Sequence, residues 1–96
     1  MNTHDLKTHP EPFQAAWEER KTYEVRKDDR GFEVGDHLIL REWDPRTRCY
    51  TLRHIVADVR YKTRGGTWGI PDGLCVLGIA ILERHQIDPT AERGAM

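Results

Sequence analysis

Apolar residues recur along five stretches of the chain as they do in β-strands, by alternation with polar residues in some and as a continuous run in the last. The first stretch is the weakest, because Leu6 is its only strongly apolar residue. Turn-favouring residues separate these stretches, among them Asp44-Pro45 and a glycine-rich loop from 62 to 73. The predicted strands are Thr3–Thr8, Thr22–Lys27, His37–Trp43, Cys49–Tyr61 and Leu74–Leu82. We expect them to pair in a mainly antiparallel sheet.

One stretch has the period of a helix instead. Its apolar stripe recurs at positions i, i+3, i+4 and i+7, namely at Phe13, Ala16, Trp17 and the stem of Arg20. Pro12 precedes the stripe, and the first helical turn tolerates proline because its missing N–H has no partner there. The sequence therefore predicts one short helix from Pro12 to Arg20.

The last two strands carry the signal for the architecture. Between 49 and 61 the apolar residues change face, which either a β-bulge or strong coiling of the strand would explain; both occur where a sheet closes into a small barrel. Leu74–Leu82 is apolar on both faces, so we expect the barrel interior to cover one side and the helix the other. The predicted fold class is α+β, a small, mostly antiparallel β-barrel, closed or half-closed, of five to six strands with one N-terminal helix packed on it.

Length and charge then narrow the class of protein. The 96 residues suffice for one domain, expected at 1–87, whereas 88–96 lack periodicity and are expected to be a disordered tail. A net charge of -1 means that any nucleic-acid binding must come from a local patch.

The sequence also bears on the location of the protein. The chain has no apolar run long enough for a membrane helix or a signal peptide. Cys49 and Cys75 lack the spacing of metal ligands or of a disulfide framework. We expect a cytoplasmic location and no membrane partner.

The stretch from Lys21 to Asp36 has the densest charge, with four basic and five acidic residues. Glu24 and Arg26 share one strand face, and Lys21 stands at the junction with the helix. A planar polar ligand such as a nucleobase could be held by these three side chains. A surface salt-bridge ladder worth about 0–1 kcal/mol is the simpler interpretation, and spacing alone favours it.

The other residues of this stretch have different expected roles. Lys27 and Arg30 are at best peripheral phosphate contacts. Gly31, Gly35 and Asp36 have the chemistry of turns and strand entry, and we expect them to be structural.

Other candidate chemistry is sparse. The five histidines are scattered, so we predict no metal site, and Cys75 is expected to be small core filler. No phosphate-binding glycine motif is present, so no cofactor is expected. Trp68 lies in the sequence GGTWG, where it either offers a stacking surface for one base or folds back to close one end of the barrel.

Three segments form a familiar pattern, namely Leu6-Lys7-Thr8 with Pro10, Lys21–Arg30 and Val34–Pro45. Together they resemble the signature of ASCH domains, which belong to the PUA-like β-barrel superfamily. The resemblance is strongest for a subfamily of unknown function that is common in bacteria and phages. The family usually has a glycine one or two residues before the lysine, where this chain has Glu18-Glu19-Arg20. The resemblance implies a cleft between helix and barrel that binds RNA or a nucleotide through Lys21, Glu24 and Arg26.

Three functions follow as hypotheses. The first is the RNA- or nucleotide-binding module that the resemblance implies. The second is a hydrolase that acts on a modified nucleoside or on RNA, similar to the acetylcytidine amidohydrolases, with Lys21 as nucleophile or base and Glu24 as proton carrier. The third is a protein-interaction module in which Trp43 and Trp68, if adjacent and exposed, form an anchor for a protein partner.

Overall fold

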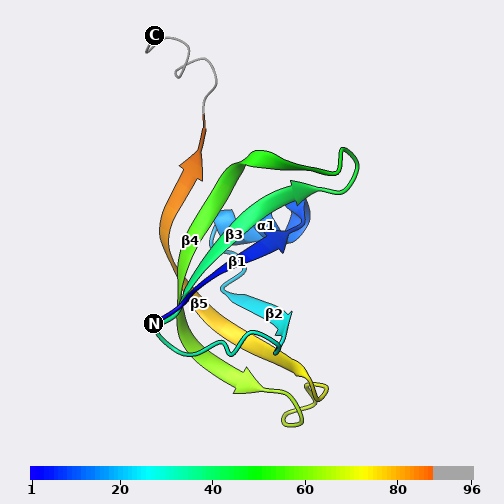
Figure 1. Cartoon of the computed structure of the whole chain (residues 1–96), viewed down its shortest axis with the longest axis vertical. Coiled ribbons are helices and arrows are strands. Elements are labelled where there is room, and N and C mark those ends of the chain that lie inside the picture. Colours follow the sequence, from blue (N-terminus) through cyan, green and yellow to red (C-terminus); the bar gives the residue numbers. More distant parts are fainter. Residues whose placement is uncertain (88–96) are drawn as a thin grey trace.

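The structure is a computed structural model that describes residues 1–87; the expected tail at 88–96 lies outside these residues. The chain forms an α+β domain with one short helix and a curled five-stranded sheet (Figure 1). The elements are β1 (Thr3–Thr8), α1 (Pro10–Trp17), β2 (Tyr23–Lys27), β3 (His37–Asp44), β4 (Cys49–Arg64) and β5 (Leu74–Gln86). Within residues 1–87, no helix is long and apolar enough to cross a membrane.

The sheet has the strand order β1-β3-β4-β5-β2. β1 is parallel to β3, and the other neighbours are antiparallel. The sheet curls so far that its edge strands, β1 and β2, approach one another, and Arg26 of β2 donates a hydrogen bond to the Lys7 carbonyl of β1 at 3.1 Å. Side chains rather than a backbone ladder join these two edges among the described residues, so the fold is a half-barrel with a seam between β1 and β2.

Register shifts supply the curl. β4 shifts its pairing with β5 between Val56 and Ala57 and again between Val59 and Tyr61, and β3 shifts against β4 between Arg41 and Trp43. Such bulges bend a strand and increase its twist. The bulge predicted from the mixed pattern of the fourth strand is confirmed.

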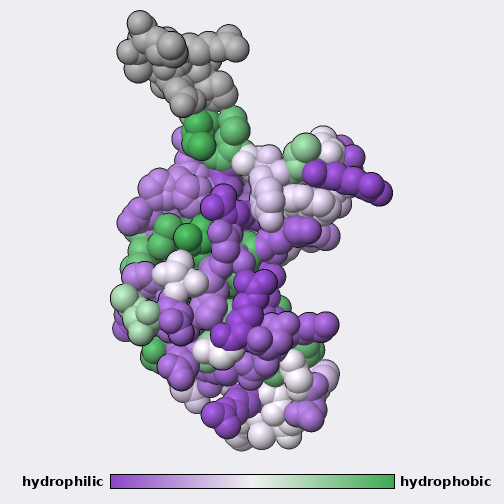
Figure 2. Space-filling view, viewed as in Figure 1, coloured by the Kyte–Doolittle hydropathy of each residue, from purple (hydrophilic) through white to green (hydrophobic). Residues whose placement is uncertain are grey.

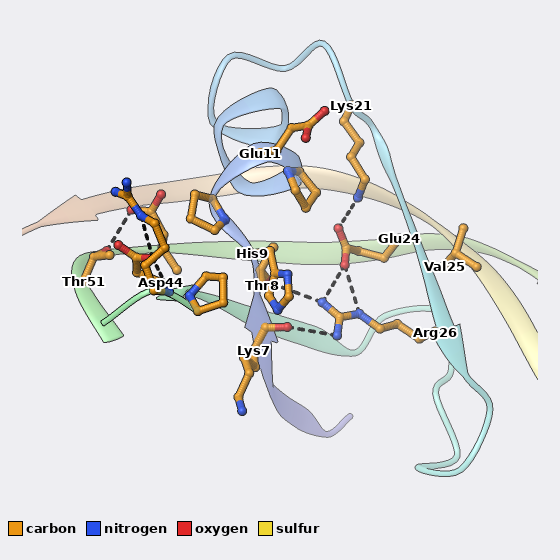
Figure 3. Close-up of a pocket in the computed structure, with 15 residues that line it drawn as sticks. Lys7, Thr8, His9, Glu11, Lys21, Glu24, Val25, Arg26, Asp44 and Thr51 are labelled. Atoms are coloured by element: carbon orange, nitrogen blue, oxygen red, sulfur yellow. Dashed lines mark hydrogen bonds and ion pairs between the residues drawn. The ribbon is translucent and has the colours of Figure 1, made fainter. Parts of the chain in front are cut away.

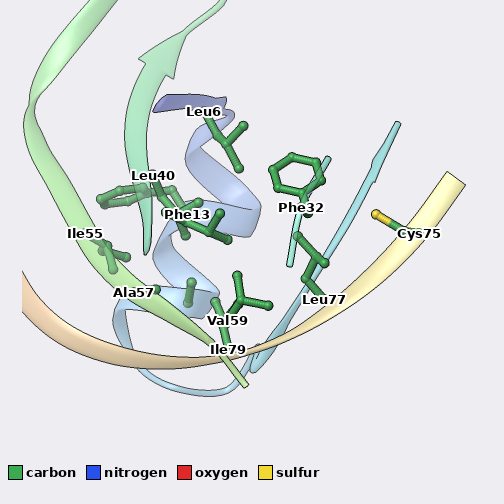
Figure 4. Close-up of a cluster of buried hydrophobic side chains, with 12 residues drawn as sticks. Leu6, Phe13, Phe32, Leu40, Ile55, Ala57, Val59, Cys75, Leu77 and Ile79 are labelled. Atoms are coloured by element: carbon green, nitrogen blue, oxygen red, sulfur yellow. The ribbon is translucent and has the colours of Figure 1, made fainter. Parts of the chain in front are cut away.

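A compact apolar core fills the inside of the half-barrel (Figure 4). The helix contributes two buried residues, Phe13 and Ala16, which explains its apolar stripe. Cys75 is buried as core filler, as predicted, and this burial raises the pKa of its thiol. The buried apolar residues are Leu6, Phe13, Ala16, Phe32, Leu38, Leu40, Ile55, Ala57, Val59, Cys75, Leu77 and Ile79.

Asp36 fixes the start of β1 against the entry to β3. Its buried carboxylate accepts hydrogen bonds from the backbone N–H groups of Asn2 and Glu33, both at 3.0 Å, and pairs with His4 Nε2 at 2.8 Å. Burial favours a raised pKa for Asp36, but these hydrogen bonds outweigh it and lower the pKa to about 2. The expected structural role of Asp36 is confirmed, and Gly31 and Gly35 take positive φ angles of 63° and 96° in the same loop.

The element bounds differ from the sequence prediction by one residue in β2 and in β3, and by more in the helix, β4 and β5. The helix spans residues 10–17 rather than 12–20, because Glu19 adopts a positive φ of 58° that ends it early. β4 and β5 extend further than expected, to Arg64 and to Gln86. The polar residues at these two ends are part of the strands because they form antiparallel backbone pairs with the other strand. The loop predicted at 62–73 is therefore shorter.

The expectation that β5 is covered on both faces is wrong. Its inward residues, Cys75, Leu77 and Ile79, are buried, whereas the outward residues between them are only half-buried. The helix packs inside the curl of the half-barrel, where its buried residues join the core, so it does not cover the outer face (Figures 1 and 4).

Candidate functional site

A cleft of about 890 Å³ opens at the seam of the half-barrel (Figure 3). The end of β1, the start of α1, β2 and the β3–β4 hairpin enclose it, and the space-filling view is hollowed between that hairpin and β2 (Figure 2). Small-molecule sites usually have volumes of about 300–1,000 Å³. The lining residues are Lys7, Thr8, His9, Pro10, Glu11, Pro12, Lys21, Glu24, Val25, Arg26, Glu42, Asp44, Pro45, Arg46 and Thr51.

Lys21, Glu24 and Arg26 come together in this cleft. The Glu24 side chain is only 3% exposed, and Figure 3 shows the Lys21 ammonium and the Arg26 guanidinium on opposite sides of its carboxylate. Lys21 Nζ donates to one carboxylate oxygen, and Arg26 donates to the other through Nε at 3.0 Å and Nη2 at 2.8 Å. The interpretation as a surface salt-bridge ladder is therefore wrong, because the shared carboxylate is buried.

The alternation of β2 explains how the charges reach the interior. Glu24 and Arg26 point inward, whereas Tyr23 and Val25 are exposed, so this edge strand reverses the usual arrangement of apolar-in and polar-out. The shared face predicted for Glu24 and Arg26 is confirmed. A buried carboxylate at this position requires paired cations, and Lys21 and Arg26 supply them.

The exit of the helix places Lys21. The backbone N–H groups of Arg20 and Lys21 both donate to the Ala15 carbonyl, at 2.9 and 3.0 Å, which turns the chain sharply toward β2. Glu19, two residues before Lys21, takes the left-handed conformation that glycine favours. The turn therefore contains a left-handed residue although no glycine is present between Glu18 and Lys21.

Arg26 also holds the seam together. Its guanidinium donates to the Lys7 carbonyl and, at 3.2 Å, to Thr8 Oγ1, in addition to Glu24. Four of its five N–H groups thus have acceptors within residues 1–87. Arg26 is both a wall of the cleft and a structural link, with one N–H group left to offer a ligand.

Lys27 and Arg30 do not line the cleft. They border a smaller groove of about 360 Å³ that also lies along the seam and shares Arg26 with the cleft. Arg30 donates to the Asp5 carbonyl of β1 at 2.8 Å, so it links β1 to the loop that follows β2. Contacts from these two residues to a ligand in the cleft would be peripheral at most.

The two candidate tryptophans lie far apart. Trp43 pairs with Tyr50 near the start of β4, whereas Trp68 lies beyond its other end, in the β4–β5 hairpin. Trp43 is half-buried, stacked on His9 at 5.8 Å between ring centres, and Lys7 Nζ lies 4.2 Å from its ring. The anchor patch of adjacent tryptophans is therefore wrong. Trp68 is 90% exposed, so of the two alternatives for this residue, the one in which it folds back to close the barrel is wrong.

A second buried carboxylate, Glu42, lines the cleft and was missed in the sequence. It accepts hydrogen bonds from Thr51 Oγ1 at 2.8 Å and from Arg53 Nε and Nη2, both at 3.0 Å. Burial favours a raised pKa for Glu42, but the bonds from Arg53 and Thr51 outweigh it and lower the pKa. The guanidinium carbon of Arg53 also lies 4.9 Å from the ring centres of Phe13 and Trp17. These cation–π contacts attach the helix to the sheet. The only sequence signal was the position of Glu42 inside the Val34–Pro45 motif.

A comparison with known families matches residues 3–79 to the family described as "Domain of unknown function (DUF3850)". The chain belongs to the DUF3850 family. All fifteen residues that line the cleft fall within the matched region. A curated relative, an uncharacterised 12.9 kDa protein encoded in the 3′ region of GpA in Escherichia phage P2, is 48% identical over 65 residues. The match covers 68% of this chain and 58% of the phage protein, so the chain spans less than two thirds of its relative.

The cleft of this DUF3850 domain is close to neutral. Four cations, Lys7, Lys21, Arg26 and Arg46, and four anions, Glu11, Glu24, Glu42 and Asp44, line it. Three proline rings and Val25 provide apolar wall between the charges. Such a lining suits a small ligand with a flat apolar surface and both donors and acceptors at its edge, rather than a run of phosphates.

Proposed function

We propose that this DUF3850 domain is a small RNA- or nucleotide-binding module that takes a nucleotide into the cleft at the seam. The observation that carries the proposal is the convergence of Lys21, Glu24 and Arg26 on one cleft wall, with the carboxylate buried and both cations partly accessible. The resemblance to ASCH domains of the PUA-like superfamily supports the same function, because its three motifs border this cleft.

The lining supports a nucleobase as the buried part of the ligand. Arg26 and Lys21 are held in place by Glu24, and each keeps a hydrogen-bond donor for a base carbonyl or ring nitrogen. The apolar walls formed by the prolines suit the face of a planar ring. Because the cations and anions of the cleft balance, we expect the affinity for an uncharged nucleoside to depend only weakly on salt.

Calorimetric titration of nucleosides and short single-stranded RNA tests the proposal. Replacing Lys21 with methionine keeps the length of the side chain and removes its charged donor. Loss of a hydrogen bond to a charged group costs about 1.5–3 kcal/mol, so we expect Lys21→Met to weaken binding roughly 10-fold to 100-fold.

Arg20→Met is the matched control. Arg20 is the chain neighbour of Lys21 and loses the same charge, but it is exposed, pairs with Glu18 and does not line the cleft. We expect it to bind as the wild type does. If both variants bind equally, or if the wild type binds neither nucleosides nor RNA, the proposal is wrong.

Hydrolysis of a modified nucleoside is the second candidate, favoured by the direct contact between Lys21 Nζ and the Glu24 carboxylate. In this arrangement Lys21 also donates to the Tyr23 carbonyl, so the amine must lose a proton before it acts as nucleophile or base. Incubation of acetylated cytidine with wild type and with Lys21→Met distinguishes the two functions. Product from the wild type alone supports a hydrolase, and binding without product supports the binding module.

A further inference from the structure

His9 brings an aromatic ring to the wall of the cleft. Among the fifteen lining residues it alone has an aromatic side chain, and it is exposed (Figure 3). Trp43 stacks on the imidazole at 5.8 Å between ring centres, with an angle of 28° between the ring planes. Because Trp43 does not line the cleft, this contact covers the side of the imidazole away from the cleft and leaves the other side open to a ligand.

The fold holds this ring without using it to cap the helix. His9 is the N-cap residue of α1, a position where Ser, Thr, Asp or Asn usually accepts a backbone hydrogen bond, but its side chain makes no capping bond. Pro10 follows directly and keeps the backbone of His9 extended, with φ and ψ of -67° and 158°. The backbone and Trp43 thus fix the ring at the cleft wall before a ligand binds, which lowers the entropic cost of stacking on it.

The helix N-terminus beside His9 presents rings to the cleft instead of N–H donors. The first hydrogen bond within the helix runs from the Phe13 N–H to the His9 carbonyl at 2.9 Å, so the three preceding positions have no acceptor in the helix. Pro10 and Pro12 occupy two of these positions and have no N–H, which leaves that of Glu11. Free N–H groups at a helix N-terminus attract phosphate, whereas here a single one remains, beside the Glu11 carboxylate. This end of the cleft therefore suits the face of a ring and not a phosphate.

The charges of the cleft wall give a phosphate no net attraction either. The four cations and four anions of the lining balance, and two of the cations share one buried carboxylate. Arg46 Nε lies 3.6 Å from Asp44 Oδ1. Lys7 Nζ lies 4.2 Å from the centre of the Trp43 ring. A neutral acceptor at the edge of a base needs one hydrogen-bond donor from such paired cations, whereas a phosphate needs excess positive charge.

We propose that the cleft recognises the nucleobase of its ligand, stacked on His9 with its edge against Lys21 and Arg26, and leaves the phosphate in solvent. The inference deepens the proposed function and rests on it, because it names the part of the nucleotide that this cleft selects. A free nucleoside and an unpaired base of RNA both supply this chemistry.

Calorimetric titration with the four common ribonucleosides tests the stacking role of His9. His9→Asn removes the ring and supplies a preferred N-cap residue, so the helix is kept and binding should weaken roughly 10-fold to 100-fold. His9→Phe keeps an aromatic ring and should bind nearly as the wild type does. His85→Asn is the matched control, since His85 is also exposed and stacked on a ring, that of His54 at 4.6 Å, but lies outside the cleft.

NMR of the histidine side chains supplies a readout that a merely structural role would not move. A base stacked on His9 shifts the His9 ring protons upfield through its ring current, whereas the ring protons of His85 should not shift. Unfolding midpoints of the variants show whether each one keeps its fold.

Two further ligands test the selection of the base. A ribonucleoside 5′-monophosphate should bind about as tightly as its nucleoside, and a preference for the monophosphate of more than about tenfold would overturn the inference. A short single-stranded RNA distinguishes the two sources of the base: tighter binding of RNA that His9→Asn weakens identifies RNA, and binding of nucleosides alone identifies the free nucleoside. RNA binding that His9→Asn leaves unchanged would overturn the inference.

The inference and the proposed function fail separately. If Lys21→Met weakens nucleoside binding while His9→Asn binds as the wild type does, or if His9→Phe binds as weakly as His9→Asn, the cleft binds its ligand but His9 is not the stacking residue. If the wild type binds neither nucleosides nor RNA, the proposed function is wrong and the inference falls with it.

Discussion

Glu24 is the residue on which the cleft most depends, because it is the one carboxylate that Lys21 and Arg26 share. Removing one member of a buried ionic network leaves its partners with uncompensated charge. We expect Glu24→Gln to lower the free energy of unfolding by about 2–3 kcal/mol, since both cations are partly exposed and water offsets some of the loss. Urea denaturation measures the effect.

Glu18→Gln is the control for this change. Glu18 also pairs with an arginine, but the pair is exposed, and such pairs contribute about 0–1 kcal/mol. Equal losses in the two variants would show that the burial of Glu24 has no special energetic role.

The lowered pKa of Asp36 predicts how the free energy of unfolding changes in acid. Its pKa is lowered from the ordinary 3.8 to about 2 in the folded protein, so the folded state holds this proton less tightly than the unfolded chain does. The stabilisation, about 2 kcal/mol, is fully present above pH 4 and is lost as the pH falls toward 2. Asp36→Asn should therefore be less stable than wild type at pH 6, and the difference should shrink at pH 2–3. A difference that does not change with pH would contradict this account.

At the scale of elements, the connection from α1 to β2 depends on the left-handed conformation of Glu19. Glycine adopts this conformation without the steric cost of a Cβ atom. We expect Glu19→Gly to stabilise the domain by up to about 1 kcal/mol, because relief of strain exceeds the loss of the exposed pair with Arg84. Arg84→Met separates the two contributions. A lower melting temperature for Glu19→Gly than for Arg84→Met would refute the explanation.

The seam between β1 and β2 depends on arginine side chains instead of a backbone ladder. Arg26→Met removes the links to Glu24, Thr8 and the Lys7 carbonyl, and we expect a loss of about 2 kcal/mol. Hydrogen exchange should accelerate most in β1 and β2, whereas the central pair β4 and β5 should keep its protection. Uniform acceleration across the sheet would show that the seam does not open on its own.

The elements themselves were largely predictable from the sequence. Alternation located β2 and β3, a mixed apolar pattern located β4, and an apolar run located β5, whereas β1 was predicted from little more than Leu6. The stripe from Phe13 to Trp17 located the helix. The end of the helix was not predictable, since a glutamate at position 19 gives no sign of a left-handed residue. The predicted β4 was too short because residues 62–64 are polar and were assigned to the loop. In the structure these residues belong to the strand because they pair with β5.

At the scale of the whole molecule, the shared face of Glu24 and Arg26 was predictable, but its burial was not. Whether that face points inward depends on the curl of the sheet, which brings β2 beside β1 although the two strands are at opposite edges. The same curl brings Glu42, from a different strand, into the cleft. This tertiary arrangement depends on register shifts at positions 41–43, 56–57 and 59–61. The mixed pattern of the fourth strand indicated a bulge there, but it gave neither the positions of the two shifts nor the shift at 41–43 in β3.

The most direct test of the central claim is a two-dimensional ¹H–¹⁵N NMR titration of the wild-type chain with a nucleoside. The account predicts saturable shifts in the backbone amides of Lys7, Thr8 and Lys21–Arg26, and of residues 42 and 51 on the facing hairpin, with no change at residues 83–86 of β5. Shifts confined to surfaces away from the cleft, or no shifts at all, would contradict it.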